Sequence, residues 1–134
     1  MKISIIIVNY YTAGYLESCI NSINNFEKEV DKEFIIVDNN SGYSDGKILN
    51  RLCEIQKNVK CLFLDANKGF AYANNRGVEN CDGDFVLILN PDIVFTESIL
   101  LKLSEYLSNE KTGALGVRLY GENGDFQKKY FDLQ

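Results

Sequence analysis

Short apolar runs alternate along this chain with segments in which apolar residues recur every three or four positions. The short runs lie at 3–8, 34–37, 59–64 and 85–89, and the periodic segments lie at 13–26, around 48–55 and at 70–80. A short run bounded by polar residues is typical of a buried strand, whereas the longer period is typical of a helix. Their regular alternation predicts an α/β fold of three layers, with a mostly parallel sheet and helices on both faces.

The last third of the chain continues the pattern less regularly. A fourth helix with Thr96 as its N-cap is expected from the helical spacing of Ile99, Leu100, Leu103 and Leu107. A fifth strand is expected at 114–119. A turn at 121–124 and a returning hairpin strand at 126–131 follow it.

Polar residues follow three of the predicted strands at the point where each strand ends. Asn9 and Tyr10 follow the first strand, Asp38 follows the second, and the Asn90-Pro91-Asp92 turn follows the fourth. Because parallel crossover connections are right-handed, the strands are expected in the order 3-2-1-4. Open α/β sheets bind ligands at the carboxyl ends of their strands, so Asn9, Tyr10, Asp38 and Asp92 are expected to line one cleft.

Length and charge exclude several classes of function. The 134 residues suffice for one domain, and a hydrophobic content of 46% suffices for a packed core. The net charge of -5 argues against nucleic acid as a partner, because nucleic-acid binding relies on Lys and Arg. No apolar run approaches the roughly 20 residues of a transmembrane helix. The first run meets polar Asn9 too soon for a secretory signal, so it is interpreted as a strand.

The chain has four cysteines and no histidine. Cys19, Cys53, Cys61 and Cys81 include no Cys-x-x-Cys pair, so zinc-ligand spacing is absent. Each cysteine lies in an apolar pattern, which predicts reduced and mostly buried thiols in a cytoplasmic protein. Without histidine, neither Ser-His-Asp nor Cys-His hydrolysis can be assembled from this chain alone.

The turn after the first strand constrains what the cleft binds. Its sequence, Asn9-Tyr10-Tyr11-Thr12-Ala13-Gly14, lacks the Gly-x-Gly-x-x-Gly cradle of dinucleotide-binding folds, and the chain also lacks a P-loop lysine motif. A bound diphosphate would therefore need a metal ion to offset its charge. Asp92 is the carboxylate best placed to hold one, and Mg²⁺ suits such a site because it commonly binds one or two carboxylates together with substrate phosphates.

Structural roles remain open for several of these residues. Asn9 and Asn40 could simply satisfy backbone groups of their turns, as Asn often does. Gly69 could start a helix and Gly77 could allow a helix to approach the sheet closely. Arg76 is more often a solvated helix residue than a ligand. Asp38 and Asp92 each follow an apolar strand at the ligand edge, which favours a functional role.

Four stretches of the chain follow one another in a recognisable order. They are Ile5 to Tyr10, the run Ile36-Val37-Asp38-Asn39-Asn40-Ser41, the stretch Asn67 to Gly77, and Gly83-Asp84 leading into Asn90-Pro91-Asp92. Together they resemble the successive signatures of family-two glycosyltransferases with the GT-A fold. The likeness covers nearly the whole chain and is greatest to the branch often labelled rhamnosyltransferase-like.

The resemblance implies a role for each motif position. Asp38, in the same motif as Asn40, matches the acid that hydrogen-bonds the pyrimidine ring of a nucleoside-diphosphate sugar, and Asn9 with Tyr10 lies where base and ribose are enclosed. Asp92 matches the last acid of an Asp-x-Asp element that binds Mg²⁺ or Mn²⁺, and Asn90 stands where most members have the first Asp. The stretch shaping the helix beside the nucleotide contains Asn67, Gly69, Asn75 and Gly77, with Arg76 as a diphosphate contact.

The resemblance also implies a substrate class and a place in the cell. A UDP- or dTDP-sugar would donate its sugar, with inversion, to a glycan or lipid-linked acceptor. The expected location is the cytoplasm, free or peripheral to the inner face of the membrane. Apart from the resemblance, a homo-oligomer is expected, because the fifth strand and Phe126, Tyr130 and Phe131 would otherwise meet solvent. The alternative is a non-catalytic nucleotide-binding or protein-interaction module built on a GT-A half-domain.

The family's general base and acceptor site come from residues further along the chain. No residue here is nominated as the base that deprotonates the acceptor hydroxyl. Residues 1–134 are therefore expected to form a single nucleotide-sugar-binding domain, truncated before the acceptor-binding half.

Overall fold

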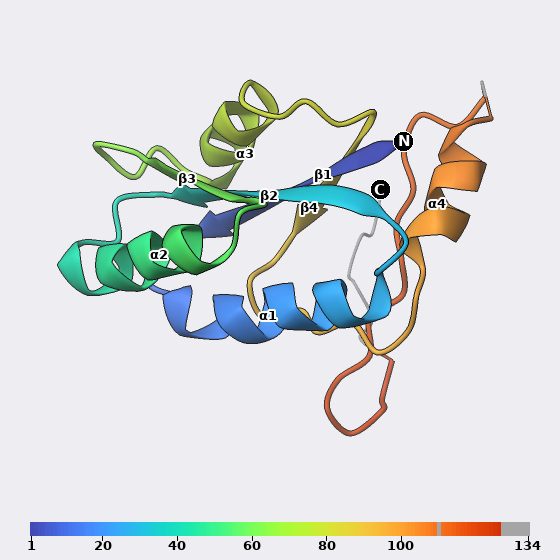
Figure 1. Ribbon diagram of the computed structural model, residues 1–134, viewed down its shortest axis with the longest axis horizontal. Coiled ribbons are helices and arrows are strands. Elements are labelled where there is room, and N and C mark those ends of the chain that lie inside the picture. Colours follow the sequence, from blue (N-terminus) through green and yellow to red (C-terminus); the bar gives the residue numbers. More distant parts are fainter. Residues whose placement is uncertain (110, 127–134) are drawn as a thin grey trace, which may run out of the picture. The chain divides into compact units, whose positions relative to one another are not determined.

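The computed structural model describes residues 1–109 and 111–126, and strands and helices alternate through the part it describes. In chain order the elements are β1 (Lys2–Asn9), α1 (Ala13–Phe26), β2 (Asp31–Asp38), α2 (Tyr43–Ile55), β3 (Val59–Phe63), α3 (Phe70–Val78), β4 (Phe85–Leu89) and α4 (Leu100–Leu107). The sheet is parallel, in the order β3-β2-β1-β4 (Figure 1). The predicted alternation and strand order are confirmed.

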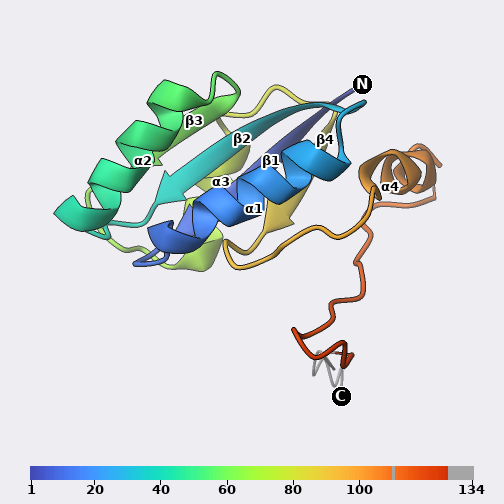
Figure 2. The same ribbon diagram turned by 60° about the horizontal axis from the view of Figure 1, so that its bottom comes forward.

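The core is built on the two central strands, which are buried on both faces. Ile6 and Val8 of β1 pack with Ile35 and Val37 of β2 and with Ala73 of α3. Because side chains alternate along a strand, the intervening apolar residues point to the opposite face. Figures 1 and 2 show α1 and α2 on that face and α3 on the other. The two layers of helices leave the carboxyl ends of the strands as the edge where the predicted site residues lie.

Gly77 allows α3 to lie close against β1. A Cβ added at this position would lie 2.5 Å from Cγ2 of Ile6, well inside van der Waals contact. Ile6 is fully buried, so its side chain has little room to move away. The close approach of α3 to Ile6 is therefore sufficient to explain why glycine occupies position 77.

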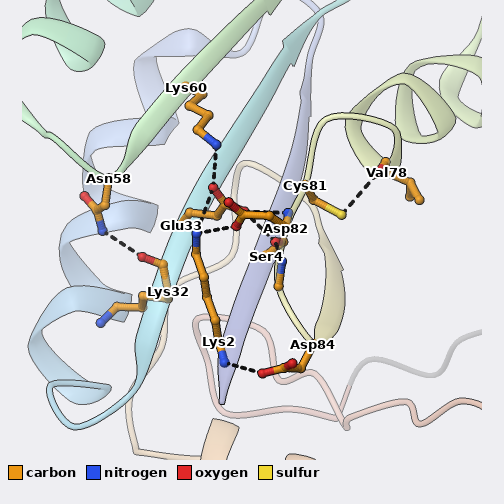
Figure 3. A network of polar contacts seen from close by, with 11 residues as sticks. Lys2, Ser4, Lys32, Glu33, Asn58, Lys60, Val78, Cys81, Asp82 and Asp84 are labelled. Carbon is orange, nitrogen blue, oxygen red and sulfur yellow. Dashed lines mark hydrogen bonds and ion pairs between the residues drawn. The ribbon is translucent and has the colours of Figure 1, made fainter.

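A buried polar network at the amino ends of the strands fixes the start of β4 (Figure 3). The carboxylate of Glu33 accepts hydrogen bonds from the Ser4 hydroxyl at 2.7 Å, from Lys60 Nζ at 2.8 Å and from the Asp82 amide at 3.0 Å. The Lys2 ammonium lies 3.3 Å from the same carboxylate. The Gly83 amide donates in turn to the Ser4 hydroxyl at 2.9 Å. These contacts tie the loop before β4 to β1 and β2.

The start of the fourth helix differs from the prediction. The helix begins at Leu100, so Thr96 is too far away to be its N-cap. The carboxylate of buried Glu27 accepts hydrogen bonds from the Ile99 amide at 2.6 Å, the Leu100 amide at 3.0 Å and the Ser98 hydroxyl at 3.0 Å. A carboxylate is a favourable partner for amides at a helix N-terminus, and here it comes from the end of α1.

The chain divides into two compact units, Met1–Leu101 and Lys102–Gln134. In the second unit the predicted strand at 114–119 is absent, and an isolated antiparallel bridge pairs Tyr120 with Phe126 around the predicted turn. The segment is exposed almost throughout and has no neighbouring strand among the described residues to complete its backbone hydrogen bonds. Most of the predicted hairpin strand at 126–131 lies outside the described residues.

The cysteines also differ from the prediction. Cys53 of α2 and Cys61 of β3 form a disulfide, with their Cα atoms 6.7 Å apart, so the expectation of four reduced thiols is wrong for this pair. Cys19 is free and buried, and Cys81 is free and half-buried. None of the helices in the described part of the chain combines the length and the apolar composition of a membrane-spanning segment.

Candidate functional site

Asn9 is the hub of a polar network at the carboxyl ends of the two central strands. It is the last residue of β1, fully buried, and pairs in register with Asp38 of β2. Its Nδ2 lies 2.8 Å from Asp38 Oδ1, 2.9 Å from Asp45 Oδ2 and 3.1 Å from the Ser41 hydroxyl. Its Oδ1 accepts hydrogen bonds from the amide and the hydroxyl of Thr12, at 3.2 Å and 3.0 Å. One side chain thus holds together the loops that follow β1 and β2.

The carboxylates of Asp38 and Asp45 share the side-chain amide of Asn9. The Nδ2 group has two hydrogens but faces three acceptors, so it can donate to at most two of them at one time. Asp45 also accepts a hydrogen bond from the Ala13 amide at 3.1 Å, at the N-terminus of α1, where a negative charge is favoured. Asp38 also accepts one from the Ser41 amide at 3.1 Å. The network therefore concentrates negative charge beneath the strand-end loops.

Asp38 lies in this network rather than on the surface. Its side chain is almost fully buried, and its described contacts are with Asn9 and Ser41. The structure thus gives Asp38 an evident part in shaping the turn after β2. Asp45 and Ser41 were missed as site residues by sequence reasoning. The available signal was their position: a serine three residues after the strand-end acid, and an acid in the first turn of α2.

Asn39 connects the Asn9 network to the loop before α3 and was likewise missed. Its backbone amide donates to the Asn9 carbonyl at 2.9 Å, and its Nδ2 donates to Asn67 Oδ1 at 2.8 Å. Asn67 Oδ1 also accepts a hydrogen bond from the amide of Gly69, which has a φ of +92° and precedes α3. Two of the predicted site residues, Asn67 and Gly69, are therefore brought to the end of β2. Asn40 lies between these contacts, exposed, in the left-handed conformation that Asn tolerates.

Two tyrosines stand exposed directly after Asn9. The Tyr10 side chain is 47% exposed and that of Tyr11 is 65% exposed. Their ring centroids are 4.7 Å apart, and the ring planes meet at 64°. The Tyr11 amide donates to the Ser41 hydroxyl at 3.0 Å, which anchors this aromatic pair to the buried network.

Asn90 and Asp92 are exposed, and no described hydrogen bond links their side chains to the Asn9 network. Burial, together with the negative charge of Asp92, raises the pKa of the Cys19 thiol to about 12, which places Asp92 near the middle of α1. The loop continues along that helix, since the Phe95 amide donates to the Ser22 hydroxyl at 3.0 Å. Asp92 makes no hydrogen bond or ion pair with any residue that the structure describes. Of the four residues predicted to line one cleft, Asn9 and Asp38 share a hydrogen bond, and no described hydrogen bond joins Asp92 to them.

The remaining predicted residues lie on α3. Asn75 and Arg76 are exposed, and the Arg76 guanidinium forms an ion pair with Glu79 of the same helix. Asn74, which was not predicted, is buried, and its Oδ1 accepts no hydrogen bond from the described residues. No described contact links Arg76 to the Asn9 network.

The protein groups around Asp92 are too few to coordinate a divalent cation unless a bound phosphate compound supplies further oxygens. Nowhere in residues 1–109 and 111–126 do three acidic or cysteine side chains cluster closely enough to hold a metal. Asp92 supplies one free carboxylate, and Asn90 supplies an amide oxygen two residues away. Mg²⁺ accepts such a sparse protein set when phosphate oxygens and water complete its shell.

Among known proteins, this chain is similar in sequence to glycosyltransferases. The chain is 28% identical over 126 residues to the uncharacterized glycosyltransferase YfnE of Bacillus subtilis, covering 90% of this chain and 31% of that protein. It is 27% identical over 133 residues to the dolichol-phosphate mannosyltransferase of Pyrococcus furiosus, covering 96% of this chain and 38% of that protein. The chain thus spans about a third of the length of these relatives.

Solved structures agree on the fold. The mannosyltransferase PcManGT from Pyrobaculum calidifontis, in complex with GDP-Man and Mn²⁺, matches with a TM-score of 0.71 at 19% identity, over 83% of this chain and 33% of that one. Residues 1–349 of Staphylococcus aureus TarS, in complex with UDP, match with a TM-score of 0.67 at 21% identity, over 87% and 38% of the two chains. These matches confirm the predicted GT-A fold.

One comparison identifies a family as well as a fold. The model of the family described as "Glycosyl transferase family 2" matches residues 4–133. That span includes every strand end and loop of the network around Asn9 as well as the Asn90-Pro91-Asp92 turn. This chain belongs to glycosyl transferase family 2.

Proposed function

We propose that this chain is the donor-binding part of a glycosyltransferase that transfers a sugar, with inversion, from a nucleoside-diphosphate sugar to a glycan or lipid-linked acceptor. The observation that carries the proposal is the Asn9 network. It organises the loops after β1 and β2 at the sheet edge where open α/β folds bind ligands. Family membership supports the reaction class, and residues 1–134 then act as one donor-binding domain.

An extended ligand does not require a hydrogen bond between Asp92 and Asn9. A nucleoside diphosphate carries its base and its diphosphate at opposite ends, so their binding groups need not touch. In this proposal Tyr10 and the loops around Asn9 hold the base and ribose, and Asp92 with Asn90 holds Mg²⁺ or Mn²⁺. A cation held there would supply positive charge to offset that of the diphosphate leaving group.

Finer assignments follow from the same motifs. Asn90 in place of a first acid supports the rhamnosyltransferase-like branch, with a hexose or rhamnose as the transferred sugar. UDP and dTDP are the proposed nucleotides. The Pyrococcus relative, named for dolichol phosphate, supports an acceptor carried on a lipid. The proposed location is the cytoplasm, free or at the inner face of the membrane.

The metal role of Asp92 has a direct test. Asp92→Ala is expected to abolish the gain in UDP affinity that Mn²⁺ or Mg²⁺ confers, because it removes the one carboxylate proposed as a ligand. Its thermal stability should match that of the parent, since Asp92 is exposed and makes no described hydrogen bond. Calorimetric titration with UDP, with and without metal, measures this. A variant whose affinity still rises with metal as the parent's does would show that the metal is held elsewhere.

A second prediction concerns recognition of the nucleobase. Asp38→Ala is expected to weaken UDP or dTDP binding by about 1–3 kcal/mol, the range for loss of a buried hydrogen-bonding partner. The structure also predicts a loss of stability, because Asn9 Nδ2 and the Ser41 amide lose an acceptor. Asp65→Ala, which removes an exposed acid after β3, is the matched control. Equal affinity of the Asp38→Ala variant and the parent would remove Asp38 from the site.

A further inference from the structure

The backbone of Tyr11 has a conformation that tyrosine rarely adopts. Its φ is +57°, and among the described residues the only other non-glycine with positive φ is Asn40, at +66°. Asn is enriched in the left-handed region, whereas a bulky side chain there is unusual. The geometry of the turn after β1 would therefore be met more easily by Asn or Gly. Backbone conformation does not explain why a tyrosine occupies this position.

Burial does not explain it either. The Tyr11 side chain is 65% exposed, so the hydrophobic core gains little from it. Its described ring contact is the edge-to-face arrangement with Tyr10, at 4.7 Å between centroids. The Tyr11 amide is held by the Ser41 hydroxyl, so the unusual backbone is fixed by the network around Asn9. Strained residues that their surroundings fix in place gather at ligand-binding sites.

We infer that Tyr11 is a positioning residue for the nucleobase of the donor, acting through Tyr10. The edge-to-face contact restricts rotation of the Tyr10 ring, which follows the buried Asn9 directly in the chain. An exposed aromatic ring held in one orientation is a stacking platform for a planar base, and every base has a π-face that can use it. This inference rests on the proposed donor site and adds a residue that determines how tightly the base is held.

Other exposed tyrosines lack this combination of features. Tyr15 of α1 is 60% exposed, has helical backbone geometry and has no described ring contact. Tyr43 of α2 contacts the Lys47 ammonium, which lies 4.7 Å from its ring centroid. Exposure alone therefore does not single out Tyr11. The unusual backbone, the ring pair and the tie to Ser41 occur together only there among the described tyrosines.

The test separates stability from affinity. Tyr11→Asn relieves the backbone and removes the ring, so its melting temperature is expected to equal or exceed that of the parent. Its affinity for UDP is expected to fall about tenfold, near the lower end of the range for loss of base stacking, because Tyr10 keeps its ring but loses the contact that orients it. Tyr11→Phe keeps the ring and should bind UDP within about twofold of the parent. Tyr11→Gly, which also suits positive φ, should behave as Tyr11→Asn does, and Tyr15→Ala should bind as the parent does.

A probe without a base distinguishes stacking from a general loosening of the site. Affinity for inorganic pyrophosphate with Mn²⁺ should be equal in the parent and in Tyr11→Asn. The inference is overturned if Tyr11→Asn and Tyr11→Gly bind UDP as tightly as the parent, or if pyrophosphate affinity falls equally. In both outcomes the parent still binds UDP, so the proposed function survives. Failure of the parent to bind any nucleoside diphosphate would overturn both.

Discussion

Replacing Asn9 with aspartate is expected to destabilise the fold by about 3–5 kcal/mol at pH 7, the range for an unpaired charge left in a buried polar site. The substitution keeps the shape of the side chain but exchanges a donor for a third carboxylate. Nδ2 of Asn9 is 2.8 Å from one Asp38 oxygen and 2.9 Å from one Asp45 oxygen. The introduced oxygen would face both with no hydrogen to share, and like charges at this distance repel strongly.

Urea denaturation measures this loss against a matched control. Asn50→Asp makes the same chemical change at an exposed position of α2 and should cost little. Like-charge neighbours raise the pKa of the introduced carboxyl above its unfolded value, so its destabilising effect is present at neutral pH and shrinks as the pH falls and the group binds a proton. Equal unfolding free energies for Asn9→Asp and Asn50→Asp would show that Asn9 is not the hub described here.

The second large effect is expected at the opposite end of the sheet. Glu33→Ala should cost about 1–3 kcal/mol, because it leaves the buried Ser4 hydroxyl without its acceptor. The Asp82 amide and the Lys60 ammonium also lose this acceptor, whereas the Lys2 ammonium keeps Asp82 as a second partner. Glu54→Ala, at an exposed position of α2, is the control and should be close to neutral.

The contribution of Glu33 should also depend on pH. Burial alone raises the pKa of its carboxyl, but hydrogen bonds from Lys60, the Asp82 amide and Ser4 outweigh burial and hold the pKa below its ordinary value of 4.5. The unfolded chain therefore binds this proton first as the pH falls. The stabilisation is complete above pH 4.5 and is lost progressively below it. A difference between parent and Glu33→Ala that stays constant from neutral pH down to about pH 3 would contradict this account.

The sheet was predictable because its signals are local. The apolar runs that became β1 to β4 are bounded by polar residues, and the right-handed crossover rule orders them. The start of α4 was not predictable in this way. Thr96 has the local sequence of an N-cap, but the carboxylate of Glu27, 72 residues before Ile99, takes the amides instead. The segment at 114–119 has the composition of a strand, but a strand also needs a partner, which local composition does not supply.

The sequence predicted which strand-end residues form the candidate site, but not the contacts between them. Strand ends identified Asn9 and Asp38, because polar residues there follow buried runs. That Asn9 also binds Asp45 depends on the register of β1 with β2 and on where α2 begins. The disulfide between Cys53 and Cys61 likewise depends on α2 lying beside β3. Each of these contacts joins residues whose proximity appears only once the chain has folded.

The central claim is that the strand-end site binds a nucleoside diphosphate together with a divalent cation. Isothermal titration of the chain with UDP, dTDP, GDP and ADP, each with and without Mn²⁺, tests it most directly. The expected result is saturable binding of UDP or dTDP that tightens when Mn²⁺ is present, with weaker binding of the purine nucleotides. Absence of binding by all four nucleotides, both with and without the cation, would contradict the claim.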